Sequence, residues 1–434
     1  MIYSSYFREE LNGIDHFTLG QRIKYVRSLK KIKQSGLAEG ICSVSYLSKV
    51  ENDSLTPSKE VERALLKRLG IYNKDKSFEQ VLSNRIDDWF QSIGTRDIEE
   101  AASEYKELKQ QLSLTSSEII LIKFKLFSVK YYIELKRHEE AYNLLENIRE
   151  SQFIMDYPLL YYYEKFQGTI RYIHKEFNSA YEHFEAAKKY SEFIDIPLGE
   201  KSSLFYSLGL VTGKLNMNQT SIDYTKKALS IYQSVYDFKK CANCHILLGI
   251  LHKRINQFSE AIEEYKKARE IALMGGYTSI LHTIEHNLGT LYSHFRNSNL
   301  AIRHFKNSLE FECRTEDVCN TYISLSKEYY ISRMVHEAKK ALTSGYKKLA
   351  DSDKVSDILQ LEYEILDRLY NGDIDRLDNK LLKAILPAFE EEDQFWLLSE
   401  YLTFIGEYYY ENGKYKKSAR YYSLANKYLK RLQT

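Results

Sequence analysis

The chain has 434 residues, enough for about three domains of average size, and contains only 4 prolines and 18 glycines. So few turn-forming residues exclude an all-β sandwich or barrel of this length. Hydrophobic residues make up 44% and charged residues 28% of the chain, which excludes wholesale disorder. The 62 Lys and Arg against 60 Asp and Glu give a net charge of +2, so any basicity that serves nucleic-acid binding must be local.

The five cysteines are too few and too scattered for a disulfide framework in a chain of this length. The first residues, MIYSSYFREELNGIDHF, have no basic segment followed by an apolar one, as a secretion signal would. No uninterrupted apolar run approaches the ~20 residues that cross a bilayer. We therefore expect a cytoplasmic protein that does not enter a membrane.

A pattern of small and large residues recurs with a period near 40 residues. In its clearest form, a Leu-Gly pair is followed twelve residues later by a small residue, then by a large one at +4 and a small one at +3. The clearest copies are Leu208-Gly209 with Ser221, Thr225 and Ala228; Leu248-Gly249 with Ala261, Tyr265 and Ala268; and Leu288-Gly289 with Ala301, Phe305 and Ser308. Further copies contain Gly168, Ser326 and Gly406, and weaker ones contain Trp89, Val129 and Ile365, which makes nine units.

Residues spaced by +4 and +3 lie on one helix face, so each unit is expected to be a pair of packed helices. Small residues let the two helices approach closely, and the large residue fills the space between neighbours. Turns within units are expected at Asn256-Gln257, Asn297–Asn299 and Asn412-Gly413, whereas Pro158 and Pro197 lie where helices end between units. The pattern resembles the tetratricopeptide helix–turn–helix repeat with longer helices.

Residues 17–72 do not follow this repeat and are predicted to form a separate unit of four helices. A tight turn at 40–42 leads into a third helix at 43–51, and Ser58 is a plausible N-cap of the fourth helix. The inward-facing apolar residues are expected to be Leu19, Ile23, Val26, Leu29, Leu37, Leu47, Val50, Val61, Leu65 and Leu69. This segment has 11 Lys and Arg against 5 Asp and Glu, a net +6, so the rest of the chain carries −4. Such segregation is typical of a nucleic-acid-binding unit attached to another domain.

The same segment resembles the helix-turn-helix of the Cro/repressor type. The residues that carry the resemblance are Leu19-Gly20-Gln21-Arg22-Ile23, Gln34, Leu37-Ala38-Glu39 and Ser45-Tyr46-Leu47-Ser48-Lys49-Val50-Glu51. In this motif the third helix enters the major groove of DNA with its N-terminal residues at base edges. The resemblance implies base contacts from one set of residues (Ser43, Val44, Ser45 and Tyr46) and phosphate contacts from another (Gln34 and Lys49). The alternative is a four-helix cap on the repeats whose lysines only keep it soluble.

The predicted fold is therefore all-α. We expect an N-terminal extension at 1–16, a helix-turn-helix domain at 17–72, a linker at 73–80 and, from 81 to 434, about nine tetratricopeptide-like hairpins. Such hairpins stack into a right-handed superhelical solenoid whose concave groove is lined by the first helix of each pair.

A Cro-type helix-turn-helix followed by such repeats resembles the RRNPP family of Gram-positive peptide-sensing regulators, most closely its NprR and PlcR branch. The resemblance implies a transcriptional regulator that binds double-stranded DNA as a homodimer. The sequence has no Gly-rich phosphate loop and no GxSxG or comparable nucleophile motif, so we expect neither enzymatic activity nor a cofactor. The resemblance also implies that a short signalling (quorum-sensing) peptide binds in the concave groove and changes solenoid curvature or oligomeric state. The alternative function is a protein-interaction regulator that sequesters or modulates a response regulator through the solenoid.

Polar residues of the first helices are the candidates for peptide binding. Counted from the repeat glycine, the positions expected to face the groove include Tyr206, Asn243, Lys253, Arg254, His286, Asn287, Thr290, His294, Asn320 and Lys327. Asparagine can pair with both the N–H and the C=O of an extended peptide, and Lys and Arg can bind its carboxylates. Asn243 and Asn287 are the leading candidates, since family members use groove asparagines in this way. The alternative for each of the others is a polar side chain that simply faces water.

Two patterns suggest other chemistry but are better explained by helix packing. The run Cys241-Ala-Asn-Cys244-His245 matches the CxxCH haem-attachment pattern, but it lies within a predicted first helix and attachment requires export. His282 and His286 have a metal-compatible spacing without a third ligand. The many aromatic residues after Phe395 are expected to form the core of the last unit, and some of them could form a dimer contact.

Overall fold

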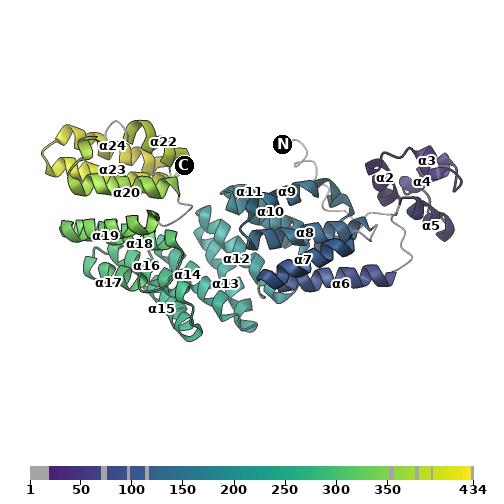
Figure 1. Ribbon diagram of the computed structural model, residues 1–434, viewed down its shortest axis with the longest axis horizontal. Helices are drawn as coiled ribbons and strands as arrows, with labels where there is room; N and C mark the ends of the chain where they lie inside the picture. The colour runs from purple at the N-terminus through teal and green to yellow at the C-terminus, as the bar shows by residue number, and fades with distance from the viewer. Residues whose placement is uncertain are drawn as a thin grey trace. The chain divides into compact units, whose positions relative to one another are not determined.

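The computed structural model describes residues 19–69, 76–94, 98–112, 117–350, 356–376, 381–391 and 394–431. These residues form helices joined by short turns, with no strand among them (Figure 1). The expected N-terminal extension lies outside the described residues, as do the first three residues of the expected linker. The chain divides into two compact units, Met1–Ile231 and Tyr232–Thr434, and each is described by itself.

Unit 1 begins with the four helices that the sequence predicts. They are α2 (Leu19–Leu29), α3 (Gln34–Ala38), α4 (Val44–Glu51) and α5 (Lys59–Arg68). Their contacts bury most of the predicted apolar residues, with Ile23, Leu37, Leu47 and Leu65 inaccessible to solvent. Leu19 and Val61 are half-buried against this core, and the side chain of Leu29 lies outside the described part. Gly20 is required where α2 crosses α4, because a Cβ there would collide with the carbonyl oxygen of Val50.

The rest of unit 1 consists of helical hairpins. The pairs are α6 (Lys76–Ser92) with α7 (Ile98–Leu112), α8 (Glu118–Glu134) with α9 (His138–Asn147), α10 (Tyr157–Ile173) with α11 (Phe177–Tyr190), and α12 (Leu198–Lys214) with α13 (Asn218–Ser234). A short 3₁₀ helix, η1 (Arg149–Ile154), connects the second pair to the third. As predicted, the prolines lie where a new hairpin starts: Pro158 is in the first turn of α10 and Pro197 is the N-cap of α12.

Unit 2 continues the same architecture. Its hairpins are α14 (Phe238–Arg254) with α15 (Phe258–Gly275), α16 (Thr278–His294) with α17 (Ser298–Ser308), α18 (Thr315–Ile331) with α19 (Val335–Ala350), and α23 (Phe395–Glu411) with α24 (Tyr415–Arg431). Between the last two pairs, α20 (Asp357–Asn371) is followed by short elements instead of one long second helix: η2 (Ile374–Arg376), η3 (Leu381–Ile385) and α22 (Leu386–Glu391). This is the eighth repeat, the weak copy that contains Ile365.

The turn inside most hairpins has one backbone geometry. The second residue after the first helix adopts a left-handed conformation in Gly94, Lys136, Lys175, Asn216, Asn256, Arg296, Arg333 and Gly413. A residue in this conformation ends a helix because its N–H can bond to a carbonyl of the last helical turn. The predicted turns at Asn256 and Gly413 are confirmed, and Asn297 caps α17 by accepting a hydrogen bond from the Leu300 N–H at 3.2 Å.

The small and large residues of the repeat pack against each other as the sequence predicts. A Cβ built on Gly249 would lie 2.5 Å from the ring of Tyr265, and one on Gly289 would lie 2.6 Å from the ring of Phe305. Both rings are almost completely buried. Glycine in the first helix is therefore what allows the aromatic residue of the second helix to lie flat against it. The all-α fold class, with a helix-turn-helix unit followed by tetratricopeptide-like hairpins, is confirmed.

Candidate DNA-binding and ligand-binding sites

An almost fully buried carboxylate organises the helix-turn-helix. Glu51, at the end of α4, is 1% exposed and accepts hydrogen bonds from Arg27 Nε at 2.6 Å and Nη2 at 2.9 Å. Gln34, the first residue of α3, donates to Glu51 Oε2 at 2.7 Å. Arg27 also donates to the carbonyl of Ile32 at 3.0 Å. One carboxylate thus ties α2, the loop before α3, and α3 to α4.

The predicted DNA-contacting residues lie at the start and on the outer face of α4. Ser43, Ser45 and Lys49 are exposed, Val44 is 45% exposed, and Tyr46 is half-buried against the core. Ser43 is also the N-cap of α4, since its Oγ accepts a hydrogen bond from the backbone N–H of Tyr46 at 3.1 Å. The hydroxyl of Ser43 therefore stabilises the helix start and can at most donate a bond elsewhere.

Gln34 has a different environment from the α4 residues. Its side-chain amide is half-buried and donates a hydrogen bond to Glu51. The sequence predicted a phosphate contact for Gln34 but not this internal bond. The bond uses one of the two amide hydrogens and leaves the other available, and the backbone N–H of Gln34 lies at the start of a helix. Gln34 therefore ties α3 to α4, and its contact with a phosphate stays a prediction.

In unit 2, three of the predicted peptide-binding residues are brought together. Lys253, near the end of α14, donates from Nζ to the hydroxyl of Thr290 on α16 at 3.2 Å. The same hydroxyl lies 2.8 Å from the carbonyl oxygen of Asn287, one turn earlier in α16. We refer to Lys253, Asn287 and Thr290 as the α14–α16 cluster.

The charge of Lys253 is not neutralised by any described part of the protein. Its side chain is largely removed from solvent, and no carboxylate bonds to it among the described residues. Burial, with a smaller contribution from the nearby charge of Arg254, lowers the pKa of Lys253. An ammonium group held in this way is stabilised by an incoming anion, because pairing offsets the cost of its desolvation.

The two predicted asparagines have unused hydrogen-bonding capacity. The side-chain nitrogen of Asn287 is buried and has no hydrogen-bond partner in the described part of the chain. Asn243, on α14, is half-buried and makes no side-chain hydrogen bond among the described residues. Buried amide groups without partners are rare in folded proteins and are costly unless something binds them.

His286, one residue before Asn287, is held by its neighbours. Its Nδ1 lies 2.9 Å from the hydroxyl of Thr321 on α18, and His282 Nε2 lies 3.3 Å from the same hydroxyl. Burial, followed by the charges of His282 and Lys253, lowers the pKa of His286 to about 4, so it is neutral at pH 7. Thr321 was not among the predicted residues, and no repeat-position signal distinguished it.

The other predicted residues are less closely connected to the α14–α16 cluster. Arg254, His294 and Asn320 are exposed, and Tyr206 lies half-buried on α12 in unit 1. Lys327 is held by an ion pair with Glu400 Oε1 at 3.1 Å, and its Nζ lies 4.4 Å from the ring centre of Tyr401. Lys327 is therefore already neutralised inside unit 2, in contrast to Lys253.

A polar pair between the two helices of a hairpin recurs in register, and sequence reasoning missed it. Glu164–His183, His245–Glu264 and Glu285–His304 join first and second helices at 2.6, 2.6 and 2.8 Å. In each hairpin the first-helix residue lies four positions before the repeat glycine, and its partner lies three positions after the first small residue of the second helix. The signal that could have found them is this shared spacing of 19 residues.

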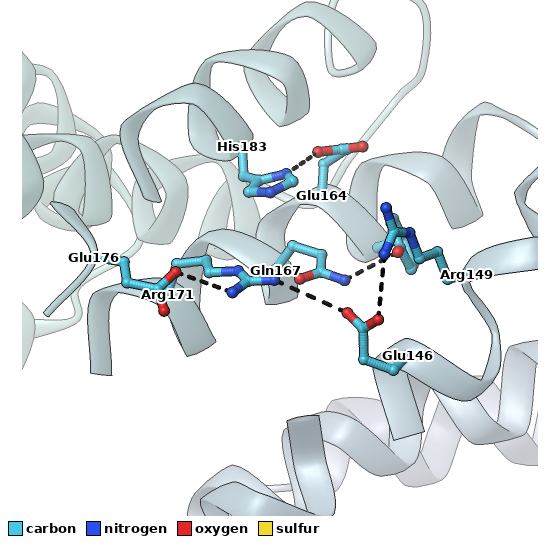
Figure 2. A network of polar contacts seen from close by, with 8 residues as sticks. Glu146, Arg149, Glu164, Gln167, Arg171, Glu176 and His183 are labelled. Atoms are coloured by element: carbon cyan, nitrogen blue, oxygen red, sulfur yellow. Dashed lines mark hydrogen bonds and ion pairs between the residues drawn. The ribbon is translucent and has the colours of Figure 1, made fainter. Parts of the chain in front are cut away.

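In unit 1 a larger polar network lies near the first of these pairs (Figure 2). Arg171 lies between Glu176, at 2.9 Å, and Glu146, at 3.9 Å, and so links α9, α10 and the start of α11. Gln167, 3% exposed, donates to the hydroxyl of Tyr163 at 2.9 Å. Among the described residues, the Gln167 oxygen and the Arg171 Nε have no partner. The network therefore holds α9, α10 and the start of α11 together.

The two alternative motifs have structural explanations. Cys241 and Cys244 are buried in α14, and burial raises the pKa of both thiols, while His245 bonds to Glu264. His282 is buried, with Nδ1 2.9 Å from the carbonyl of Ser308. Over the described ranges, no group of three His, Cys, Asp or Glu is placed to hold a metal ion. In the same ranges, no helix is both long and apolar enough to cross a bilayer.

Comparison with known proteins places the chain among bacterial regulators. It is 34% identical over 406 residues to the transcriptional activator NprA of Geobacillus stearothermophilus, covering 91% of this chain and 99% of NprA. The chain belongs to the RRNPP family. No protein-family model matches it. A more distant relative is response regulator aspartate phosphatase I of Bacillus subtilis (strain 168), 21% identical over 82% of this chain and 93% of the phosphatase.

Solved structures share the fold. The apo form of the quorum sensor NprR from B. thuringiensis matches with a TM-score of 0.68 and 16% identity, over 81% of this chain and 99% of NprR. NprR in complex with its cognate peptide NprX matches with a TM-score of 0.61 and 17% identity, over 80% of this chain and 99% of that chain. These matches establish that the RRNPP chain has the repeat fold of NprR.

Proposed function

We propose that this RRNPP protein is a transcriptional regulator that binds operator DNA through α4 and is switched by a short signalling peptide. The observation that carries the proposal is the α14–α16 cluster. Among the described residues, its lysine is not neutralised and bonds to Thr290, one turn from Asn287, whose buried side-chain nitrogen has no partner. The relatives support the two halves of the proposal: NprA is named a transcriptional activator, and NprR has been solved with a cognate peptide.

The DNA-binding half depends on the exposed outer face of α4. Ser45 and Tyr46 can donate and accept hydrogen bonds, and Val44 can pack against a thymine methyl. Residues 17–72, which include α4, carry a net charge of +6, and this charge attracts the DNA phosphates. A homodimer would present two copies of α4 to a palindromic site, as two-fold symmetry requires.

The peptide-binding half depends on unused donors and charge. Asn243 and Asn287 can each pair with the main chain of an extended peptide, which needs both a donor and an acceptor. Lys253 can bind a carboxylate of the peptide, either a side chain or its C-terminus. A ligand with backbone amides and an acidic group satisfies all three residues at once.

Selection from a random operator library tests the DNA-binding half. The full chain, with and without peptide, is expected to enrich one sequence family in a gel-shift selection. Ser45→Ala with Tyr46→Ala should abolish the enrichment, whereas Ser28→Ala, an exposed serine on α2, should preserve it. No enriched sequence under any peptide condition would contradict the proposal.

Calorimetry tests the peptide-binding half. The probes are synthetic peptides covering the last residues of any secreted pro-peptide encoded directly downstream of the gene. We expect one of them to bind. Asn243→Ala and Asn287→Ala should each lower the affinity for that peptide about ten-fold or more, because a peptide group is left unpaired. Unchanged affinity in both variants would exclude these contacts.

A second function is favoured by one comparison. Because aspartate phosphatase I is similar over most of this chain, the repeats could also act on a phosphorylated response regulator. The full chain would then form a complex with such a regulator in sedimentation and change the half-life of its phosphoaspartate. If no complex forms and the half-life of the phosphoaspartate stays the same, this second function is excluded.

A further inference from the structure

The last helix of the described chain has an unusual composition. α24 contains six basic residues, Lys416, Lys417, Arg420, Lys427, Lys430 and Arg431, and no Asp or Glu. Four of them follow the spacing of one helix face, because steps of 4, 7 and 3 residues return to nearly the same angle. We call Lys416, Arg420, Lys427 and Lys430 the α24 stripe.

The opposite face of α24 holds it against the rest of unit 2. Ser418, Tyr421, Ala425 and Tyr428 are buried, and the Tyr421 ring stacks on Tyr409 of α23 with centroids 5.5 Å apart. All four residues of the α24 stripe are exposed. In Figure 1, α24 is the last labelled helix along the chain, so no later hairpin of the described residues packs on its outer face.

The basic residues outside the stripe are neutralised locally. Lys417 Nζ lies 2.7 Å from Asp375, together with Lys414 of the preceding turn at 2.5 Å. Arg431 lies 3.4 Å from Glu390 on α22. In contrast, no hydrogen bond or ion pair joins any residue of the α24 stripe to another described residue. The stripe is therefore a row of positive charge, uncompensated by the described residues, over more than three helical turns.

The chemistry of this face favours a nucleic-acid backbone as its partner. An amphipathic helix binds a membrane through its apolar face, and the apolar face of α24 is already buried in the protein core. Protein–protein interfaces are depleted of lysine, whereas protein–DNA interfaces are much more positively charged. A straight row of long cationic side chains, without carboxylates between them, is complementary to a row of phosphates.

We propose that the α24 stripe is a second, sequence-independent contact of this protein with the phosphate backbone of duplex DNA. This contact needs no base recognition by α4. It adds affinity and salt dependence to DNA binding without adding sequence preference, because phosphates carry no sequence information.

The test is a salt titration of binding to a duplex of random sequence. Fluorescence anisotropy would compare the full wild-type chain with a variant in which Lys416, Arg420, Lys427 and Lys430 are replaced by Gln. Each lost phosphate contact lowers the slope of log affinity against log salt by about 0.9, so the slope should fall by about 3 to 4. Raising the salt from about 50 to about 200 mM should therefore weaken DNA binding by the wild type roughly a hundred-fold more than it weakens binding by the stripe variant.

A matched control separates a local contact from net charge. Lys189→Gln, Lys226→Gln, Lys239→Gln and Lys347→Gln together remove four exposed positive charges from four other helices. The control is expected to keep the wild-type slope to within about one unit. Equal slopes in the wild type and the stripe variant, or equal losses in the stripe variant and the control, would overturn the proposal.

Two further measurements separate the phosphate contact from base recognition by α4 and from self-association. In a chain that carries Ser45→Ala and Tyr46→Ala, replacing the stripe residues should still lower the salt slope on random DNA. This result would hold even if α4 recognises no bases, so the two proposals can fail separately. Sedimentation of wild type and stripe variant without DNA should give the same mass. A smaller mass for the variant, with an unchanged DNA slope, would assign the face to a second copy of the chain and overturn the proposal. Thermal unfolding checks that the variant retains its fold.

Discussion

The ammonium group of Lys253 lies 3.2 Å from the hydroxyl of Thr290, and no carboxylate balances its charge among the described residues. Lys327, on a similar first-helix face in the same unit, is paired with Glu400 and lies over the ring of Tyr401. Lys327 is thus neutralised within the fold, whereas the charge of Lys253 has no such partner, and we propose that a ligand with a negative charge binds it.

Lys253→Met should separate stability from binding. Methionine keeps the apolar stem and removes the desolvated charge, so the free energy of unfolding should stay the same or rise. The affinity for an acidic peptide should fall about ten-fold or more, measured by calorimetry. Lys327→Met is the contrasting variant: it leaves Glu400 without its cation and should lower the unfolding temperature. Loss of stability in Lys253→Met, without loss of peptide affinity, would show that Lys253 is structural.

Glu51→Ala should destabilise the helix-turn-helix strongly. The substitution leaves Arg27, whose side chain is 14% exposed, without its carboxylate, and such an unpaired charge costs about 3 kcal/mol. Hydrogen exchange of the α2 and α4 amides should accelerate accordingly, and DNA affinity should fall with it. Lys24→Ala removes only an exposed hydrogen bond to Asn52 and should cost less than about 1 kcal/mol. Similar exchange rates in the two variants would contradict the organising role of Glu51.

Gly289→Ala should cost about 1 to 3 kcal/mol, because the new Cβ would lie 2.6 Å from the buried Phe305 ring, which has no room to move. Gly406→Ala should cost less, since its Cβ would lie 3.3 Å from Tyr422, which is only half-buried. Gly199→Ala meets nothing within 4 Å and should stabilise α12 by roughly 0.5 to 1 kcal/mol. Urea unfolding measures all three, and any other order of stability would refute the close-packing account.

The His245–Glu264 pair predicts an acid-sensitive contribution to stability. Burial raises the pKa of Glu264, but hydrogen bonds from His245 and Lys267 outweigh it and lower the pKa to about 2, against an ordinary 4.5. A carboxyl whose folded pKa is depressed stabilises the fold above its unfolded pKa, and this stability is lost as the pH falls towards the folded value. The wild-type free energy of unfolding should therefore drop more steeply between pH 4.5 and 2 than that of Glu264→Gln. Glu263→Gln, which removes an exposed pair with Lys266, should retain the wild-type pH dependence.

Local sequence determined the helices and their partners within each hairpin. The periodic small and large residues, the turn asparagines and the caps at Ser43 and Ser58 act over a few residues, so their geometry follows from the chain itself. The same holds for α4, because periodicity predicted that Leu47 and Val50 lie on its buried face. The weak pattern did not predict the short elements of the eighth repeat, since the equally weak copies at Trp89 and Val129 form ordinary hairpins.

The tertiary structure alone decided which polar groups are paired. Lys253 and Lys327 are both at first-helix positions predicted to face the groove, and only the packing of α23 brings Glu400, 73 residues away in the chain, to Lys327. Likewise, the bond of Gln34 to Glu51 and the recurring His–Glu pairs join residues on different helices. A hydrogen bond depends on distances of a few tenths of an ångström between such helices, and hydrophobic periodicity, which fixes only the face that each helix buries, carries no information at that scale.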